Sequence, residues 1–330
     1  MKKVLFVMAS VIAMVVATDA GWAQTTVKMR LGHDLAPTHP WHQASLRFAE
    51  DLKAKSNNTL ELSVFPSSQL GDLRELMELT QRGTLDFNIN TSGILATFVP
   101  DANIFNLPFL FSDYKQAEEF YKSKAADKIK VSCEKARIKC LTFMTTVFRS
   151  PMNNKRSIRT PEDMSGLKIR LMQVPIHIDT YKALGAAPTA LPFSELYTAA
   201  QTGVVDGFEN AVGTLHTSKL YEVGKYLDTL PVFLYTNVLA MSPRTYQKLT
   251  AAQQQAILDS LPQFVASIDK AMLDFETTGL EAMKSRGVVA NTGPFDLKAF
   301  RKAVAPVYAR YVPTLSAEMQ EEVRRLQKSW

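Results

Sequence analysis

An arginine and an asparagine at the ends of two predicted strands are the residues of this chain best suited to bind an acid. Residues 167–172 alternate apolar and polar side chains, the period of a strand with one buried face, and Arg170 points off that face near the strand's end. Asn210 follows a short buried strand predicted at 204–208. Ligands of open parallel sheets bind beyond the carboxyl ends of strands, where both side chains would fall.

The chemistry of these two side chains suits one carboxylate. A guanidinium offers a planar fork of donors that can form two parallel charge-assisted hydrogen bonds to a carboxylate. The asparagine amide can hold one oxygen or orient the arginine. Arg170 and Asn210 therefore predict a site that binds an acid without breaking it. The alternative is an exposed arginine and an asparagine that caps a helix.

Two helices are predicted between these strands. The first covers residues 174–184 and ends at Gly185. The second covers residues 194–202, with Ser194 as its N-cap and Gly203 just past its end. The helices would bring the two strand ends back to the same edge of a sheet.

The same alternation recurs near the start of the chain, where strands are predicted at 27–31 and 60–64 on either side of a helix at 41–52. Repeated β-α-β units predict an α/β fold with mostly parallel sheets covered by helices. With 330 residues, the chain exceeds one ordinary core and favours two domains.

Two further features support a two-lobed design. The segments QRGTLDF at 81–87 and QTGVVDGF at 201–208 share a helix end, a glycine C-cap, a short strand and an aspartate, which indicates the same unit in each lobe, although chance similarity is the alternative. A helix predicted at 262–286 would be about 37 Å long, which exceeds the width of one small domain. We expect it to lie across both lobes.

The first residues predict export. Lys2 and Lys3 precede an apolar run at 4–17, and small residues up to Ala23 offer a cleavage site, so residues 1–23 are predicted to be a signal peptide cleaved near Ala23. A retained N-terminal anchor is the alternative. We expect the mature protein in the periplasm.

Two cysteines, Cys133 and Cys140, lie close together in this exported chain. An oxidising compartment permits a disulfide between them, and two buried thiols are the alternative. Nothing nearby supplies the further ligands of a metal site, so we expect no metal here.

Composition and motifs argue against the other large classes of protein. The net charge of +6 is modest and scattered, and the tightest basic run, at 155–159, has no interleaved aromatic residues, so we expect no nucleic-acid partner. The five histidines lack metal-binding spacing, and neither a nucleophile elbow nor a phosphate loop is present. We therefore expect neither an enzyme nor a bound cofactor.

Several longer segments resemble the solute-binding proteins of TRAP (tripartite ATP-independent periplasmic) transporters, the DctP-like family. They follow the family's order and, together, cover essentially the whole mature chain. The segments lie at 65–87, 105–111, 161–172, 184–210 and 219–227.

This resemblance implies a two-lobed periplasmic-binding-protein fold, with hinge strands near 141–148 and 234–241 and a long C-terminal helix that spans both lobes. Lobe I would comprise residues 24–146 with 236–275, and lobe II residues 147–235 with 276–330.

The resemblance also assigns roles in lobe II. Arg170 would grip the ligand carboxylate and Asn210 would support it. Arg149 would also face the ligand, and Phe193 would pack on the ligand body.

Lobe I and the second hinge strand would decide which acid binds. Asp34 would repel a second carboxylate but accept hydrogen bonds from hydroxyl groups, which favours a sugar acid such as a uronate or aldonate over a C4-dicarboxylate. His39, Trp41 and His42 have an alternative role, in which they begin a helix and pack structurally. The further candidates for ligand contact are His33, Asn90, Thr91, Trp41, Tyr235 and Asn237.

Taken with the family resemblance, these residues predict a monomeric periplasmic receptor. It would close around an organic acid and deliver it to the small and large integral membrane subunits of a TRAP transporter. The alternatives are a C4-dicarboxylate or other carboxylate receptor of the same family, or a solute receptor of an ABC importer or sensor.

Overall fold

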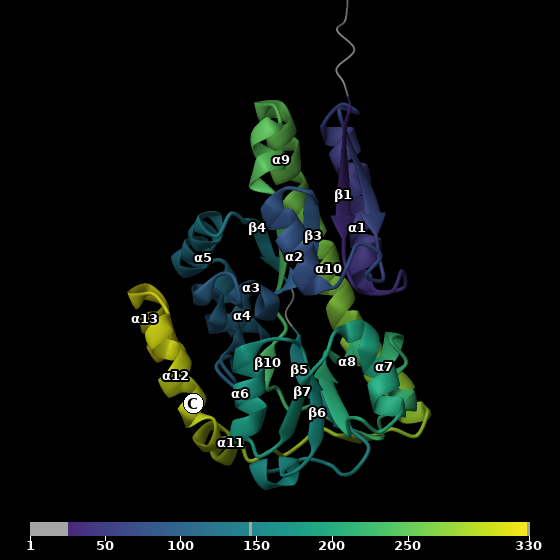
Figure 1. Ribbon diagram of the computed structural model, residues 1–330, viewed down its shortest axis with the longest axis vertical. Coiled ribbons are helices and arrows are strands. Elements are labelled where there is room, and N and C mark those ends of the chain that lie inside the picture. The colour runs from purple at the N-terminus through teal and green to yellow at the C-terminus, as the bar shows by residue number, and fades with distance from the viewer. Residues whose placement is uncertain (1–25, 145–146, 329–330) are drawn as a thin grey trace, which may run out of the picture.

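The computed structural model describes residues 26–144 and 147–328, so the predicted signal peptide lies outside the described residues. Two sheets lie one above the other (Figure 1), which agrees with the expected α/β fold. The first has the strand order β2-β1-β3-β11-β4. These strands are β1 (Val27–Gly32), β2 (Leu60–Phe65), β3 (Phe87–Thr91), β4 (Lys139–Met144) and β11 (Asn237–Met241).

The second sheet has the order β12-β9-β5-β8-β6-β7, and β10 pairs with β5. Its strands are β5 (Phe148–Asn153), β6 (Lys168–Leu171), β7 (Ala187–Ala190), β8 (Gly207–Asn210), β9 (Tyr226–Asp228), β10 (Phe233–Leu234) and β12 (Val289–Asn291).

Both sheets are mixed, whereas the sequence predicted mostly parallel ones. β1 runs parallel to β2 and β3, and β6 runs parallel to β7 and β8. The chain crosses between sheets from β4 to β5 and from β10 to β11. After a crossing, the chain enters the new sheet at the edge where the carboxyl ends of its parallel strands lie. The strand that follows must therefore run antiparallel to those strands. β11 is accordingly antiparallel to β3, and β5 to β8.

The helices cover these sheets. The α-helices are α1 (Pro40–Lys55), α2 (Leu73–Arg82), α3 (Ser92–Ala96), α4 (Tyr114–Tyr121), α5 (Lys124–Lys135), α6 (Pro175–Ala183), α7 (Phe193–Gln201), α8 (Val212–Thr217), α9 (Pro243–Lys248), α10 (Ala251–Ser285), α11 (Leu297–Ala303), α12 (Ala305–Tyr311) and α13 (Ala317–Gln327), and the 3-10 helices are η1 (Pro100–Asn106), η2 (Pro161–Met164), η3 (Leu220–Glu222) and η4 (Val312–Thr314).

Helix α10 is the long helix expected to span both lobes, and Figure 1 shows it passing from the upper sheet to the lower one. It packs against α1 beside the first sheet and against α8 beside the second. The predicted start at Pro262 was wrong, because the helix begins at Ala251 behind a capping box of Thr250 and Gln253. Burial of Ile257 and Phe264 on either side of Pro262 offsets the cost of an interior proline, about 3 kcal/mol.

Two smaller boundaries also differ from the prediction. Helix α7 begins at Phe193 with Pro192 as N-cap, so Ser194 lies inside it. Strand β8 begins at Gly207 because Val204 is 55% exposed and belongs to the preceding turn. Asn210 is therefore the last residue of the strand and does not lie beyond it.

The internal repeat corresponds to a shared structural unit. Helices α2 and α7 are each followed by a glycine with positive φ, Gly83 and Gly203, and then by an aspartate before a parallel strand. Asp86 accepts a hydrogen bond from the backbone N–H of Arg30 at 2.8 Å, and Asp206 from that of Lys168 at 3.0 Å. Each aspartate thus ties the start of its strand to the neighbouring parallel strand.

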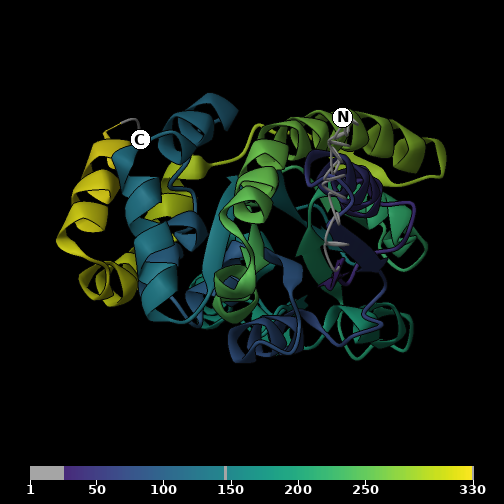
Figure 2. The same cartoon turned by 90° about the horizontal axis from the view of Figure 1, so that it is seen from above.

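The C-terminal helices reach across the molecule. Helix α12 packs on α6, and α13 packs on α5 and η1. Figure 2 shows them in yellow at one end of the molecule, beside the blue-green α5. Residues 317–327 thus lie against elements that precede the first crossing.

A disulfide joins Cys133 in α5 to Cys140 in β4. It closes a short loop between the helix and the strand. Among the residues with described structure, we found no helix with the length and apolar character needed to cross a membrane.

Candidate functional site

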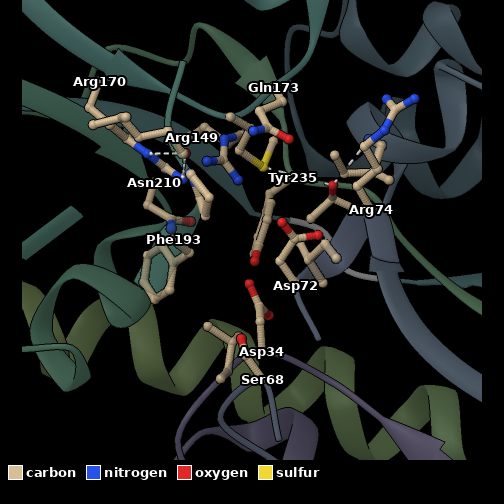
Figure 3. A pocket seen from close by; sticks show the side chains of 17 residues that line it. Asp34, Ser68, Asp72, Arg74, Arg149, Arg170, Gln173, Phe193, Asn210 and Tyr235 are labelled. Carbon is tan, nitrogen blue, oxygen red and sulfur yellow. Dashed lines mark hydrogen bonds between the residues drawn. The ribbon is translucent and has the colours of Figure 1, made fainter. Parts of the chain in front are cut away.

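A cavity lies where the carboxyl ends of both sheets face each other. Its empty volume is about 540 Å³, including the part open to solvent. Figure 3 shows side chains from both sheets pointing into it. The lining residues are Asp34, Leu35, Ser68, Asp72, Leu73, Arg74, Thr91, Ile94, Arg149, Arg170, Met172, Gln173, Leu191, Pro192, Phe193, Asn210 and Tyr235.

Arg170, on β6, is the cation in this cavity that is best placed to meet an anion. Its side chain is buried, and Nε and Nη2 donate to the carbonyl oxygen of Leu191 at 2.9 and 2.6 Å. Its Nη1 has no hydrogen-bond partner within the described structure. Burial lowers the pKa of Arg170 to about 10, which still leaves the guanidinium charged at neutral pH. The Leu191 carbonyl therefore orients a buried cation that retains unused donors.

Arg149, on β5, is held by a carboxylate that we did not identify from the sequence. Its Nε donates to Oε2 of Glu209, and its Nη2 donates to Oε1 at 2.9 Å and to the Glu209 carbonyl oxygen at 3.1 Å. Burial alone would lower the pKa of Arg149, but the Glu209 carboxylate outweighs it and raises the pKa. The signal in the sequence was a glutamate directly after a predicted buried strand, since a charge that becomes buried there needs a partner.

Asn210 and two aromatic rings complete the wall formed by the second sheet and by the segment between β10 and β11. Asn210 Oδ1 accepts from the backbone N–H of Ala211 at 2.9 Å, which leaves its NH₂ group as a donor. Phe193 begins α7, and its ring centroid is 5.8 Å from the Arg170 guanidinium carbon. Tyr235 lies between β10 and β11, with its ring centroid 4.9 Å from the guanidinium carbon of Arg149.

The opposite wall carries acceptors and hydroxyl groups. Asp34 lies in the turn after β1, and its Oδ1 is buried with no hydrogen-bond partner in the described part of the chain. Burial raises the pKa of Asp34 to about 7, although Arg170 and Arg149 both act to lower it. Ser68 and Thr91 add hydroxyl groups to this wall.

Two other charged residues on this wall already have partners. Asp72 caps α2 by accepting from the backbone N–H of Glu75 at 2.9 Å. Arg74 pairs with Glu78, one turn further along the same helix, at 3.3 Å. We did not predict Ser68, Asp72, Arg74 or Gln173 as cavity residues. The loop after β2, the first turn of α2 and the turn after β6 carry no pattern that points to a ligand.

The structure brings seven of the eleven predicted ligand-binding residues to this cavity. They are Arg170, Arg149, Asn210, Phe193, Asp34, Thr91 and Tyr235. The other four, His33, Asn90, Trp41 and Asn237, do not line it.

Each of these four residues has a structural contact instead. His33 Nε2 lies 3.2 Å from His42 Nδ1, and Asn90 donates to the Leu73 carbonyl oxygen at 2.7 Å. Asn90 and Thr91 are neighbours in an extended strand, so only one of them can point toward the cavity. The ring of Trp41 stacks on that of Tyr235, with centroids 6.2 Å apart, and therefore supports the cavity wall from behind. Asn237 pairs with Thr91 in the sheet.

His39 is the N-cap of α1, and its Nδ1 accepts from the Trp41 backbone N–H at 3.2 Å. Its Nε2 lies 3.2 Å from Oγ1 of Thr214 on α8. This hydrogen bond joins the loop after β1 to a helix beside the second sheet, so it connects the two lobes. His39 therefore has a structural role at the start of the helix, which agrees with the alternative that this segment begins a helix and packs structurally.

These features together define a binding site. Within residues 26–144 and 147–328, no group of three or more histidine, cysteine, aspartate or glutamate side chains is arranged to hold a metal ion. The cavity offers oriented cationic donors, an amide and aromatic walls between two lobes, which is the arrangement of a solute-binding protein.

Comparison with known proteins identifies the family. Residues 31–314 match the bacterial extracellular solute-binding protein family 7, and the chain belongs to this DctP family of TRAP periplasmic solute-binding proteins. Members of the family bind solutes for transport, so the expectation that this chain is not an enzyme is confirmed.

Three relatives illustrate the match. A solute-binding protein of Verminephrobacter eiseniae is 32% identical over 307 residues, covering 92% of this chain and 90% of that protein. A TRAP solute-binding protein of Polaromonas, solved with D-erythronate, is 30% identical and has a TM-score of 0.86, covering 91% and 98% of the two chains. One from Roseobacter denitrificans, solved with β-D-glucuronate, is 26% identical with a TM-score of 0.88, covering 91% and 99%. The expected two-lobed fold is confirmed.

Proposed function

We propose that this protein is a periplasmic receptor that binds one small hydroxylated monocarboxylate, of the sugar-acid class, and delivers it to the membrane subunits of a TRAP transporter. The observation that carries this proposal is the buried guanidinium of Arg170. It is oriented by the Leu191 carbonyl, and its Nη1 lacks a partner in the described structure.

The charges around the cavity favour a single carboxylate on the side of the second sheet. Glu209 neutralises Arg149, and no carboxylate makes the same direct pair with Arg170 among the described residues. An anion bound there would accept hydrogen bonds from Arg170 and from the NH₂ group of Asn210. Arg149 lines the same side of the cavity, but Glu209 already compensates its charge. Once closure of the lobes excludes water from the site, these charge-assisted bonds would be stronger than they are on the surface.

The opposite wall suits hydroxyl groups. Asp34 is an acceptor when ionised, and Ser68 and Thr91 can both donate and accept. The rings of Phe193 and Tyr235 can pack against the carbon skeleton of a sugar acid. The D-erythronate and β-D-glucuronate held by two relatives of the same fold support this class of ligand.

Ligand binding would favour the closed arrangement of the lobes. A ligand held by Arg170 on one wall and Asp34 on the other contacts both lobes only when they are close. Its differential affinity for that form shifts the equilibrium toward it. The two crossings between the sheets and helix α10 would act as the connections about which the lobes move.

The cellular setting follows from the family and the predicted leader. We propose that the signal peptide at 1–23 is cleaved near Ala23 and that the mature receptor is a periplasmic monomer. It would dock on the small and large integral membrane subunits of the transporter. A receptor of an ABC importer or sensor would share the cleft chemistry, and genes for two membrane subunits beside this one would favour the TRAP assignment.

A C4-dicarboxylate receptor is the second candidate. Arg74 lines the cavity on the wall opposite Arg170 and is a second cation that the far carboxylate of a diacid could meet. Its ion pair with Glu78 makes this the weaker choice.

A thermal-shift panel tests the proposed function. It would contain D-erythronate, galactonate, gluconate, D-glucuronate, succinate and malate, because bound ligand stabilises the folded protein by mass action. We expect the sugar acids to raise the melting temperature and to show saturable binding by calorimetry. Stabilisation by the C4-dicarboxylates alone would favour the second candidate, and no response to any of these acids would contradict the proposal.

A further inference from the structure

Asp34 is the acidic group in the cavity whose hydrogen bonding is incomplete. Its Oδ1 is buried without a partner in the described part of the chain, and Asp34 lines the cavity. Figure 3 shows Asp34 reaching into the cavity from the wall opposite Arg149 and Arg170, with the hydroxyl end of Tyr235 pointing into the same space. A ligand whose carboxylate lies at the arginines would therefore present its other end to Asp34.

The charged groups that face Asp34 come from several elements. Arg170 on β6 and Arg149 on β5 act to lower its pKa, and Asp72 at the start of α2 acts to raise it. The positive charge of Arg149 is offset by Glu209 on β8.

The two titratable neighbours that remain are neutral at physiological pH. Burial lowers the pKa of His33 to about 3, so its imidazole is uncharged. Burial raises the pKa of Tyr235, so its phenol keeps its proton. Arg74 on α2 also lines the cavity but pairs with Glu78. No cation in direct contact compensates Asp34 among the described residues, and burial raises its pKa to about 7.

The two protonation states of such a group recognise different chemistry. An ionised carboxylate only accepts hydrogen bonds, so it suits the hydroxyl end of an aldonate. A protonated carboxyl can donate, so it suits a second carboxylate on the ligand. Two carboxylates in contact in a buried site cannot both stay ionised at low cost, and one of them must keep a proton.

We propose that Asp34 selects the group at the end of the ligand opposite the carboxylate, and that its proton makes this selection depend on pH. This inference rests on the proposed function. Above neutral pH, the site would prefer acids that end in a hydroxyl group. Below it, the site would tolerate acids that end in a second carboxylate.

A matched pair of ligands tests this. An aldonate and the aldarate of the same skeleton, such as galactonate and galactarate, share the carboxylate that meets the arginines and differ only at the far end. Both ligands are fully ionised between pH 6 and 8.5, so their own titration does not contribute. We expect the ratio of the galactarate Kd to the galactonate Kd, measured by calorimetry, to rise by up to about thirtyfold over this range, at about tenfold per pH unit above pH 7.

Two variants locate the effect. Asp34→Asn keeps the shape of the side chain but removes its titration, so we expect the ratio to become independent of pH. Asp72→Asn is the control, because asparagine also caps helices and Asp72 is the other acid on this wall, and we expect it to keep the pH dependence. If Asp34→Asn does not fold, the wild-type profile compared with that of Asp72→Asn still tests the proposal.

The outcomes distinguish a failure of the proposed function from a failure of the role proposed for Asp34. If galactonate does not bind, gluconate with glucarate or erythronate with meso-tartrate replaces the pair. Failure of every aldonate and uronate to bind would contradict the proposed function itself, whereas binding of a uronate without any aldonate would overturn only the role of Asp34. Aldonate binding with a ratio that does not change with pH, or that changes equally in Asp34→Asn, would overturn only the role of Asp34.

Discussion

The guanidinium of Arg149 is hydrogen-bonded to the carboxylate of Glu209, and both side chains are buried. They lie on the neighbouring antiparallel strands β5 and β8, and β8 also borders β6, which carries Arg170. Glu209 thus stands between two arginines and pairs directly with one of them. Because Arg170 has no such direct counter-ion among the described residues, it is the better anion site of the two. The first two predictions concern these residues.

Replacing Arg170 with alanine should weaken sugar-acid binding by about 3–5 kcal/mol, because it removes one partner of a buried charge pair. That loss corresponds to a Kd more than a hundredfold higher, which calorimetry can measure. Arg74→Ala is the matched control, because Arg74 lines the same cavity but pairs with Glu78. The Arg74→Ala variant should raise the Kd less than tenfold. Binding by Arg170→Ala within threefold of the wild type would show that the carboxylate lies elsewhere.

Replacing Glu209 with glutamine should lower the free energy of unfolding by about 3–5 kcal/mol, because the charge of Arg149 is left buried without its counter-ion. Denaturant unfolding of the ligand-free protein would measure the loss. The double variant Arg149→Met with Glu209→Gln should recover part of it, since the unpaired charge is then gone. Equal stability of Glu209→Gln and wild type would mean that solvent already screens the pair.

The hydrogen bond between His39 and Thr214 should contribute to ligand affinity without touching the ligand, because it joins the two lobes. Thr214→Val removes Oγ1 while keeping the shape, and we expect a Kd about three- to tenfold higher, the worth of one hydrogen bond. Thr217→Val is the control, since its Oγ1 donates to the Gly213 carbonyl oxygen within the same helix at 3.0 Å. Equal effects of the two variants would indicate a change in α8 and not in lobe closure.

Glu276 on α10 should make stability depend on pH. Its carboxylate accepts from the backbone N–H groups of Val212 and Gly213 at 3.0 and 2.9 Å, yet burial dominates and raises its pKa to about 7. The folded state therefore binds this proton more tightly than the unfolded state. The contribution of Glu276 to stability falls as the pH rises from about 4.5 to about 7.

Comparison of Glu276→Gln with the wild type isolates this effect. The difference cancels other groups, including the buried histidines, whose lowered pKa values act in the opposite direction. We expect the variant to gain stability relative to the wild type between pH 4.5 and 7, as measured by urea unfolding at each pH. A stability difference that is constant over this range would show that Glu276 keeps an ordinary pKa in the folded protein.

Much of the site was predictable because local pattern places a residue at the end of an element. Arg170 and Asn210 were found from strand alternation and from the helices between their strands. The prediction was less successful in lobe I, where His33, Asn90 and Trp41 were expected at the ligand and lie behind the wall. A sequence shows that such polar residues follow a strand, but which neighbour faces inward depends on packing that involves distant segments.

The amino-acid sequence by itself determined the α/β alternation, the leader typical of an exported protein and Arg170 as the cation that marks an acid site. Strand and helix periods, leader composition and side-chain charge are local properties. Only the tertiary structure decided that Glu209 compensates Arg149, that Leu191 orients Arg170, and that Asp34 faces them from the other wall. Burial and the pairing of charges depend on which strand ends meet across the cleft, and that is a property of the folded chain.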